Sequence, residues 1–179
     1  ANFIKVMFPN EDDIPATLLY KDPIHNLAVL QLNNRPKVKH KQFIYSKNGY
    51  GLRSEYVYTI GYPWANTMED KHILIKGSTS LSYKLDLIPI TMPLNPVNSG
   101  GPLFNSNNEL VGMVLFEKHA VDYYKLERSK IYNYAIPAST LIMVIKKLKL
   151  KNEAQNLKTS SRELFIETRN KNIILIEAY

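Results

Sequence analysis

One segment of the sequence carries a side chain that could act as a nucleophile. Ser99 is followed by Gly100, Gly101 and Pro102 and then by apolar residues. A loop of this composition can expose a hydroxyl while its backbone N–H groups point at a developing oxyanion, because glycine allows the tight backbone that such a loop needs. The segment predicts a nucleophile loop, although the same composition also suits an ordinary turn.

Composition restricts the other chemistry. The chain has 179 residues and no cysteine, which excludes a thiol nucleophile, a disulfide framework and Cys-based zinc or iron–sulfur sites. No metal-ligand cluster stands out, so we predict no metal and no cofactor. The formal net charge is +7. Since the cations are mostly scattered lysines, we interpret this charge as a solubilising surface and predict no nucleic-acid partner.

The elements that must position the nucleophile loop are short strands. Apolar runs separated by turn-forming residues fill residues 1–120, with almost no helical periodicity. This pattern favours an all-β sandwich or barrel of antiparallel strands. The expected strands are 3–8, 14–20, 27–32, 43–45, 56–60, 72–75, 87–92 and 110–116.

A helix is predicted late in the chain. Ser139 can cap it, and apolar residues recur at helical spacing from Leu141 to Leu148. A cluster of lysines at its end complements the helix dipole. The polar stretch 151–161 indicates a linker, and the apolar stretches 164–166 and 173–176 predict a short β-hairpin tail.

Four segments of the sequence form recognisable motifs. They are Asn95-Pro-Val-Asn-Ser-Gly-Gly-Pro-Leu103 with Glu109-Leu-Val-Gly-Met113, Lys21-Asp-Pro-Ile-His-Asn-Leu-Ala-Val-Leu30, Tyr56-Val-Tyr-Thr-Ile-Gly-Tyr-Pro63 and Tyr134-Ala-Ile-Pro137. In this order along the chain, they resemble trypsin-like serine proteases of the HtrA/Deg type. The resemblance implies two six-stranded antiparallel β-barrels with the site between them. We therefore expect a protease domain over residues 1–150 and a linker with a hairpin over 151–179, without a PDZ module.

The catalytic triad that the resemblance implies is incomplete. Ser99 matches the nucleophile, but Asn26 stands where the family has aspartate. An amide neither holds the histidine tautomer nor stabilises the imidazolium, and the Asp→Asn change in a serine-protease triad costs about 10⁴ in turnover. The family's histidine position falls upstream of Ala1. His25 should face away from the cleft, because neighbouring residues on a strand point to opposite faces. We expect the remaining histidines on the surface: His40, His72 and His119.

The oxyanion hole that the resemblance implies consists of Val97, Asn98 and Ser99. The family has glycine where this chain has Val97, a β-branched residue that resists unusual backbone conformations. Loss of one donor costs about 10²–10³ in rate. The Ser99 N–H is then predicted as the remaining donor.

The resemblance also implies a substrate pocket and a partner. The expected pocket residues are Met113, Val114, Leu115 and Phe116, which indicate a shallow apolar pocket for a peptide or an unfolded protein. A homotrimer is an option that the family allows. No membrane span is expected, residues 1–13 lack a signal-peptide pattern, and the compartment stays unassigned.

The first barrel is predicted to lack strands. If the chain begins just after the family's histidine, either it is a fragment or its first barrel is remodelled, with the C-terminal hairpin filling the gap. Two functions remain open. One is a weak or inactive pseudoprotease that binds peptide or protein. The other is an active serine endopeptidase whose histidine lies upstream of Ala1.

Overall fold

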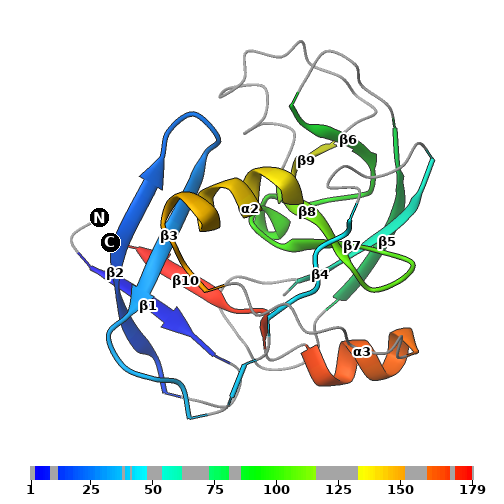
Figure 1. Ribbon diagram of the computed structural model, residues 1–179. Helices are drawn as coiled ribbons and strands as arrows, with labels where there is room; N and C mark the ends of the chain where they lie inside the picture. Colours follow the sequence, from blue (N-terminus) through cyan, green and yellow to red (C-terminus); the bar gives the residue numbers. More distant parts are fainter. Residues whose placement is uncertain are drawn as a thin grey trace. The chain divides into compact units, whose positions relative to one another are not determined.

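The protein consists of two compact units, each built mainly from β-strands (Figure 1). Unit 1 comprises residues 1–41 and 167–179, and unit 2 comprises residues 42–166. The computed structural model describes residues 3–8, 12–37, 39–40, 42–47, 54–61, 73–80, 86–115, 133–151, 161–169 and 172–178. The prediction of an all-β fold with a late helix is confirmed.

Unit 1 contains a four-stranded antiparallel sheet in the order β10-β1-β2-β3. The apolar side chains that alternate along its strands form a small core around Val6, which is 1% exposed. Val6 pairs with Ile14 on one side and with Ile176 on the other, so the last strand is part of the sheet. The strands are β1 (Ile4–Met7), β2 (Ile14–Asp22), β3 (Leu27–Leu32) and β10 (Leu175–Ala178).

Unit 2 is a closed six-stranded antiparallel barrel in the order β4-β5-β6-β9-β8-β7, and pairing of β4 with β7 closes it. A closed barrel leaves no exposed sheet edge and therefore holds the loops between its strands on a rigid frame. This is the six-stranded barrel that the resemblance implies. The strands are β4 (Tyr56–Gly61), β5 (Ile73–Thr79), β6 (Ile88–Thr91), β7 (Pro102–Asn105), β8 (Leu110–Leu115) and β9 (Asn133–Pro137).

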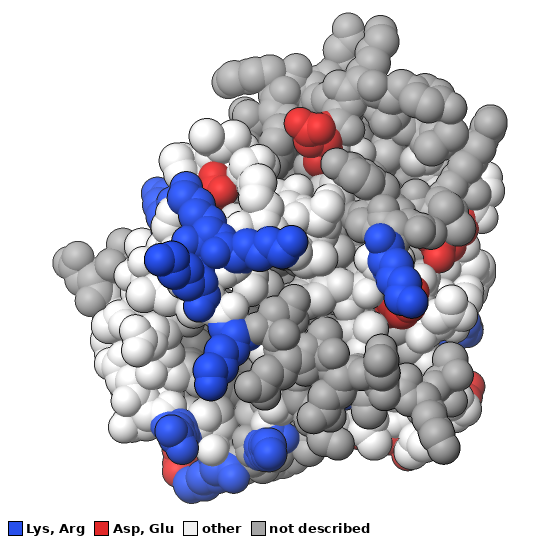
Figure 2. Space-filling view, in the orientation of Figure 1, with Lys and Arg blue, Asp and Glu red and all other residues white. Residues whose placement is uncertain are grey.

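The predicted late helix is α2 (Ala138–Lys147), which follows β9 directly. The prediction that Ser139 caps this helix is wrong. Pro137 ends β9 in an extended conformation and is itself the N-cap, so Ser139 lies inside the first turn and makes no capping bond. Lysine side chains gather where the helix ends (Figure 2). Among the described residues, no helix combines the length and the apolarity needed to cross a membrane.

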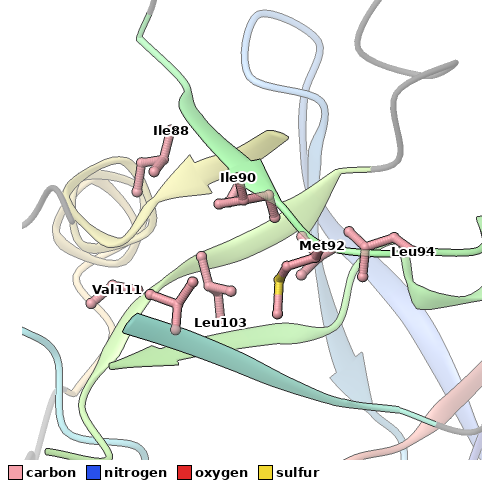
Figure 3. Packing of buried hydrophobic residues seen from close by; sticks show 9 residues of the cluster. Ile88, Ile90, Met92, Leu94, Leu103 and Val111 are labelled. Atoms are coloured by element: carbon pink, nitrogen blue, oxygen red, sulfur yellow. The ribbon is translucent and has the colours of Figure 1, made fainter. Parts of the chain in front are cut away.

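The barrel encloses a core of aliphatic side chains from its strands (Figure 3). Leu103 from β7 and Val114 from β8 are both 0% exposed. Two further members of this core, Met92 and Leu94, follow β6 and lead directly towards the Ser99 segment. The segment that carries the predicted nucleophile therefore starts and ends on residues packed inside the barrel.

The predicted C-terminal hairpin is wrong in its first half. Residues 164–166 belong to a helix, α3 (Arg162–Arg169). The Ser161 hydroxyl accepts the Leu164 N–H at 3.3 Å, which caps the helix. Helical spacing then places two side chains on the barrel: Phe165 packs edge-on against Phe104 at 5.1 Å, and the Arg162 guanidinium lies 5.2 Å from the centre of a tyrosine ring, that of Tyr58. These contacts favour the helix over a strand. In the second half, β10 pairs with β1 instead of with a hairpin partner.

Candidate active site

The nucleophile loop (residues 95–101) links β6 to β7 and contains a single 3-10 turn, η1 (Pro96–Asn98). The buried Asn98 holds this turn together. Its side-chain Oδ1 accepts the Asn95 N–H at 2.8 Å, and its own backbone N–H donates to the Asn95 carbonyl at 2.9 Å. The loop is therefore closed on itself just ahead of Ser99.

The backbone donors expected to form the oxyanion hole do not converge in this structure. The Ser99 N–H donates to the Pro96 carbonyl oxygen at 3.1 Å. The peptide between Pro96 and Val97 is trans, as the described residues contain no cis bond. In a trans peptide the C=O and the N–H point in opposite directions. Because the Pro96 carbonyl points at the Ser99 N–H, the Val97 N–H points away from it.

The sequence predicts the Ser99 N–H as the remaining oxyanion donor, whereas in the structure that N–H is bonded to Pro96. The orientation of the peptide between Pro96 and Val97 decides this, and the residue types of the loop do not by themselves fix that orientation. The Val97 side chain is 44% exposed, so tight packing does not hold it in place. An oxyanion at this position would meet a carbonyl oxygen instead of two N–H groups.

Two glycines seat the nucleophile loop on β8. The Gly100 N–H donates to the Val114 carbonyl at 2.8 Å, and the Val114 N–H donates to the Gly101 carbonyl at 2.8 Å. Gly100 has φ +86°, a left-handed backbone conformation that residues other than Gly and Asn rarely adopt. A Cβ on Gly101 would lie 3.0 Å from the Asn98 carbonyl oxygen. Ser99 is thereby held, partly buried, at the rim of the barrel.

The predicted pocket residues divide into three groups. Met113 is half-buried. Val114 and Leu115 are 0% and 3% exposed, so both side chains are buried. Val114 belongs to the barrel core and contributes to the site through its backbone. Phe116 lies outside the described residues.

Asn26 lies in unit 1, in a turn that connects β2 to β3. The Asp22 carboxylate organises this turn: its Oδ1 accepts the N–H groups of Ile24 and His25 at 2.9 and 3.1 Å. Asn26 follows with φ 53°, in the left-handed region that asparagine tolerates. The expectation of a strand here is wrong, because these bonds to the carboxylate fold the chain into a turn. We name residues 22–26 the Asp22 turn.

His25 pairs with Asp22 within this turn. The ring Nδ1 donates to Asp22 Oδ2 at 2.8 Å, and Asp22 is 5% exposed. The hydrogen bond from His25 holds the pKa of Asp22 below its ordinary value of 3.8, against the opposing effect of burial. The carboxylate is therefore ionised near neutral pH. The sequence signal is the pair Asp22 and His25, three residues apart and adjacent to the Asn26 position.

Of the other three histidines, the structure describes His40 alone. His40 lies in a loop as predicted, but its ring packs against Phe8 at 4.8 Å, so the surface placement is corrected to a half-buried one. His72 and His119 lie outside the described residues. Within the described ranges, no group of three or more His, Cys, Asp or Glu side chains could hold a metal ion.

Comparison with known proteins decides the family. The sequence profile of the trypsin-like peptidase domain matches residues 1–113. The chain belongs to the trypsin-like peptidases. It is 32% identical over 122 residues to a probable periplasmic serine endoprotease DegP-like from Pseudomonas putida (strain W619). It is also 27% identical over 115 residues to the uncharacterized protein y4bJ from Sinorhizobium fredii (strain NBRC 101917 / NGR234).

These similarities support an HtrA-type serine protease domain. The matches cover 63% and 62% of this chain but only 24% and 18% of the two relatives. The chain thus spans about a quarter or less of the length of the curated relatives it matches. Within this trypsin-like peptidase, unit 2 holds Ser99, Val97 and Asn98 in one loop, while unit 1 holds Asn26 in the Asp22 turn.

Proposed function

We propose that this HtrA-type domain is a weak or inactive protease that retains the binding of peptide or unfolded protein. The observation that carries the proposal is the 3.1 Å hydrogen bond from the Ser99 N–H to the Pro96 carbonyl. Acyl transfer needs N–H groups preorganised around the oxyanion, and removing one donor already costs about 10²–10³ in rate. Here the loop would have to rearrange before either N–H could serve.

Two residue substitutions support the same proposal. Val97 replaces the glycine that lets a peptide in this position turn, and β-branched residues have few backbone conformations to choose from. Asn26 replaces the carboxylate that stabilises a protonated histidine, a change worth about 10⁴ in turnover in a working triad. Residues of one catalytic unit act together, so these losses do not multiply.

The alternative is an active serine endopeptidase whose histidine lies upstream of Ala1. In that mechanism Ser99 Oγ attacks the scissile carbonyl, the histidine takes the hydroxyl proton, and Asn26 orients the histidine ring. The glycine seat of the nucleophile loop favours this function, because Gly100 and Gly101 keep the backbone bonds to Val114 that hold Ser99 in place.

Labelling with a fluorophosphonate probe separates the two functions. The full-length protein is incubated with the probe, and intact mass reports modification, with Ser99→Ala as the matched control. We expect slow labelling that is far from stoichiometric. Rapid, stoichiometric labelling that disappears in Ser99→Ala would establish the endopeptidase and overturn the proposal.

Binding needs its own measurement. Fluorescence anisotropy with labelled, unfolded casein should give saturable binding for the parent protein and for Ser99→Ala alike. Absence of saturable binding would remove the binding part of the proposal. Light scattering of the same samples measures whether a homotrimer forms.

The boundary at residue 150 stays a prediction, and the pairing of β10 with β1 argues that the final strand belongs with unit 1. A role in protein quality control is part of this proposal.

A further inference from the structure

The end of α2 presents a basic surface that the protease chemistry does not use. Four exposed lysines fall within six residues, and residues 138–151 contain no acidic side chain. Figure 2 shows lysine side chains gathered where α2 ends. The lysines are Lys146, Lys147, Lys149 and Lys151.

Exposed apolar side chains lie among these lysines. Met143 is 47% exposed and Leu150 is 40% exposed. Met143 and Lys147 are four residues apart, so they share one face of the helix. We name this combination of four lysines with Met143 and Leu150 the α2 terminal surface.

The backbone at the helix end is fixed by a Schellman turn. The Leu150 N–H donates to the Ile145 carbonyl at 3.1 Å, and the Lys149 N–H donates to the Lys146 carbonyl at 3.0 Å. Just beyond, the Gln42 side chain donates to the Lys151 carbonyl at 3.1 Å. The backbone beneath the α2 terminal surface therefore has a defined conformation.

Lys149 occupies the position in this turn that normally belongs to glycine. Its φ is 52°, a conformation that is strained for a side chain such as lysine. The helix dipole explains cations in the last turn, such as Lys146 and Lys147. It does not explain a lysine placed where glycine would be more stable.

We propose that the α2 terminal surface binds the surface of an anionic phospholipid membrane. The lysines attract the headgroup phosphates, and Met143 and Leu150 enter the interface between headgroups and acyl chains. Nucleic acid fits less well, since it is bound by arginine forks and aromatic stacking, and this surface has lysines with aliphatic neighbours. The proposal does not depend on whether Ser99 is active.

Cosedimentation with lipid vesicles tests the proposal on the full-length protein. Vesicles of phosphatidylglycerol and phosphatidylcholine should bind the protein, vesicles of phosphatidylcholine alone should not, and binding should weaken with added salt. Each lysine near an anionic membrane contributes about fivefold in affinity. The triple variant Lys146→Gln, Lys147→Gln, Lys151→Gln should therefore lose on the order of a hundredfold in affinity.

A charge-matched control separates a specific surface from general charge. The variant Lys21→Gln, Lys47→Gln, Lys76→Gln removes the same charge from exposed lysines outside α2 and should keep its vesicle affinity. Equal losses in the two triple variants would overturn the proposal. So would stronger binding to duplex DNA than to anionic vesicles, provided that the α2 variant abolishes it.

Lys149→Gly distinguishes binding from structure because the two effects have opposite signs. Glycine relieves the left-handed strain, so the melting temperature should rise, while the lost charge should weaken vesicle binding about fivefold. A more stable variant with unchanged vesicle affinity would show that Lys149 has no part in binding and would contradict the proposal. Met143→Ser should weaken binding without changing its salt dependence, because it removes only the apolar contact.

Discussion

The nucleophile loop and the Asp22 turn contain Ser99 and Asn26, the two residues for which the resemblance predicts catalytic positions, and the two segments are held in different ways. The nucleophile loop is fixed by neutral backbone bonds to a barrel strand, between Gly100, Gly101 and Val114. The Asp22 turn is fixed by one carboxylate that accepts the Ile24 N–H, the His25 N–H and the His25 ring. The loop should thus share the stability of the barrel, whereas the turn should depend on one ionised group.

The largest effect on stability is expected from a substitution that leaves a cavity in the barrel core. Leu103 is fully buried, and Leu103→Ala should lower the free energy of unfolding by about 2–5 kcal/mol. Hydrogen exchange at the Gly100 amide should accelerate accordingly, while the amides of Ile24 and His25 should exchange as before. Chemical denaturation and exchange mass spectrometry measure both. Equal acceleration in the Asp22 turn would mean that the two units unfold together. It would contradict the idea that the nucleophile loop and the Asp22 turn are stabilised independently.

The next effect is expected from the turn itself. Asp22→Ala removes the acceptor of three hydrogen bonds and should cost about 1–3 kcal/mol, because hydrogen bonds to charged groups are the stronger ones. Exchange should accelerate at Ile24 and His25 and stay unchanged at Gly100. Asp12→Ala is the matched control, since Asp12 is an exposed carboxylate that pairs with exposed Lys37. Normal protection at Ile24 in Asp22→Ala would refute the assigned role of the carboxylate.

A smaller effect compares the left-handed residues of the two segments. A Cβ on Gly100 would meet no atom within 4 Å, so Gly100→Ala tests the φ of +86° alone and should cost about 1–2 kcal/mol. Asn26→Gly should keep the turn at nearly unchanged stability, because glycine accepts a φ of 53°. Thermal denaturation of the two variants gives the comparison. Destabilisation by Asn26→Gly as large as that of Gly100→Ala would show that the Asn26 side chain matters to the fold.

The smallest effect is the pH dependence of the turn. The pKa of Asp22 is lowered in the folded protein, chiefly by the hydrogen bond from His25. A carboxyl with a lowered pKa stabilises the fold above its unfolded pKa of about 3.9, and this contribution is lost as pH falls through the folded value. Unfolding free energy should therefore drop below about pH 4, and less so in Asp22→Asn. An identical acid profile in both proteins would contradict the prediction.

The strand pattern was predictable where burial alternates or runs continuously. Residues 14–20, 27–32, 56–60 and 110–115 lie in β2, β3, β4 and β8, as their apolar runs predict. Residues 43–45 have similar composition but form only an isolated bridge, from Tyr45 to Leu110. Phe43 packs on Phe104 from outside the sheet, a contact that no local pattern encodes.

The tail and the site required tertiary information. The apolar residues around Phe165 predict a strand. The contact of Phe165 with Phe104 and the capping of α3 by Ser161 favour a helix instead. The residues of the nucleophile loop were predictable from their motif. The orientation of the peptide between Pro96 and Val97 was not predictable. It depends on a backbone torsion that the sequence Asn-Pro-Val-Asn-Ser allows in more than one state.

The pairing of β1 with β10 has a consequence for the order of folding. Ile4 pairs with Ala178, so this sheet joins residues from opposite ends of the described chain. The barrel strands lie between residues 56 and 137 and can pair while a ribosome is still adding later residues. The sheet of unit 1 can be completed only after Leu175–Ala178 has emerged. Until then, the edge of β1 that pairs with β10 is open to chaperones and to neighbouring chains.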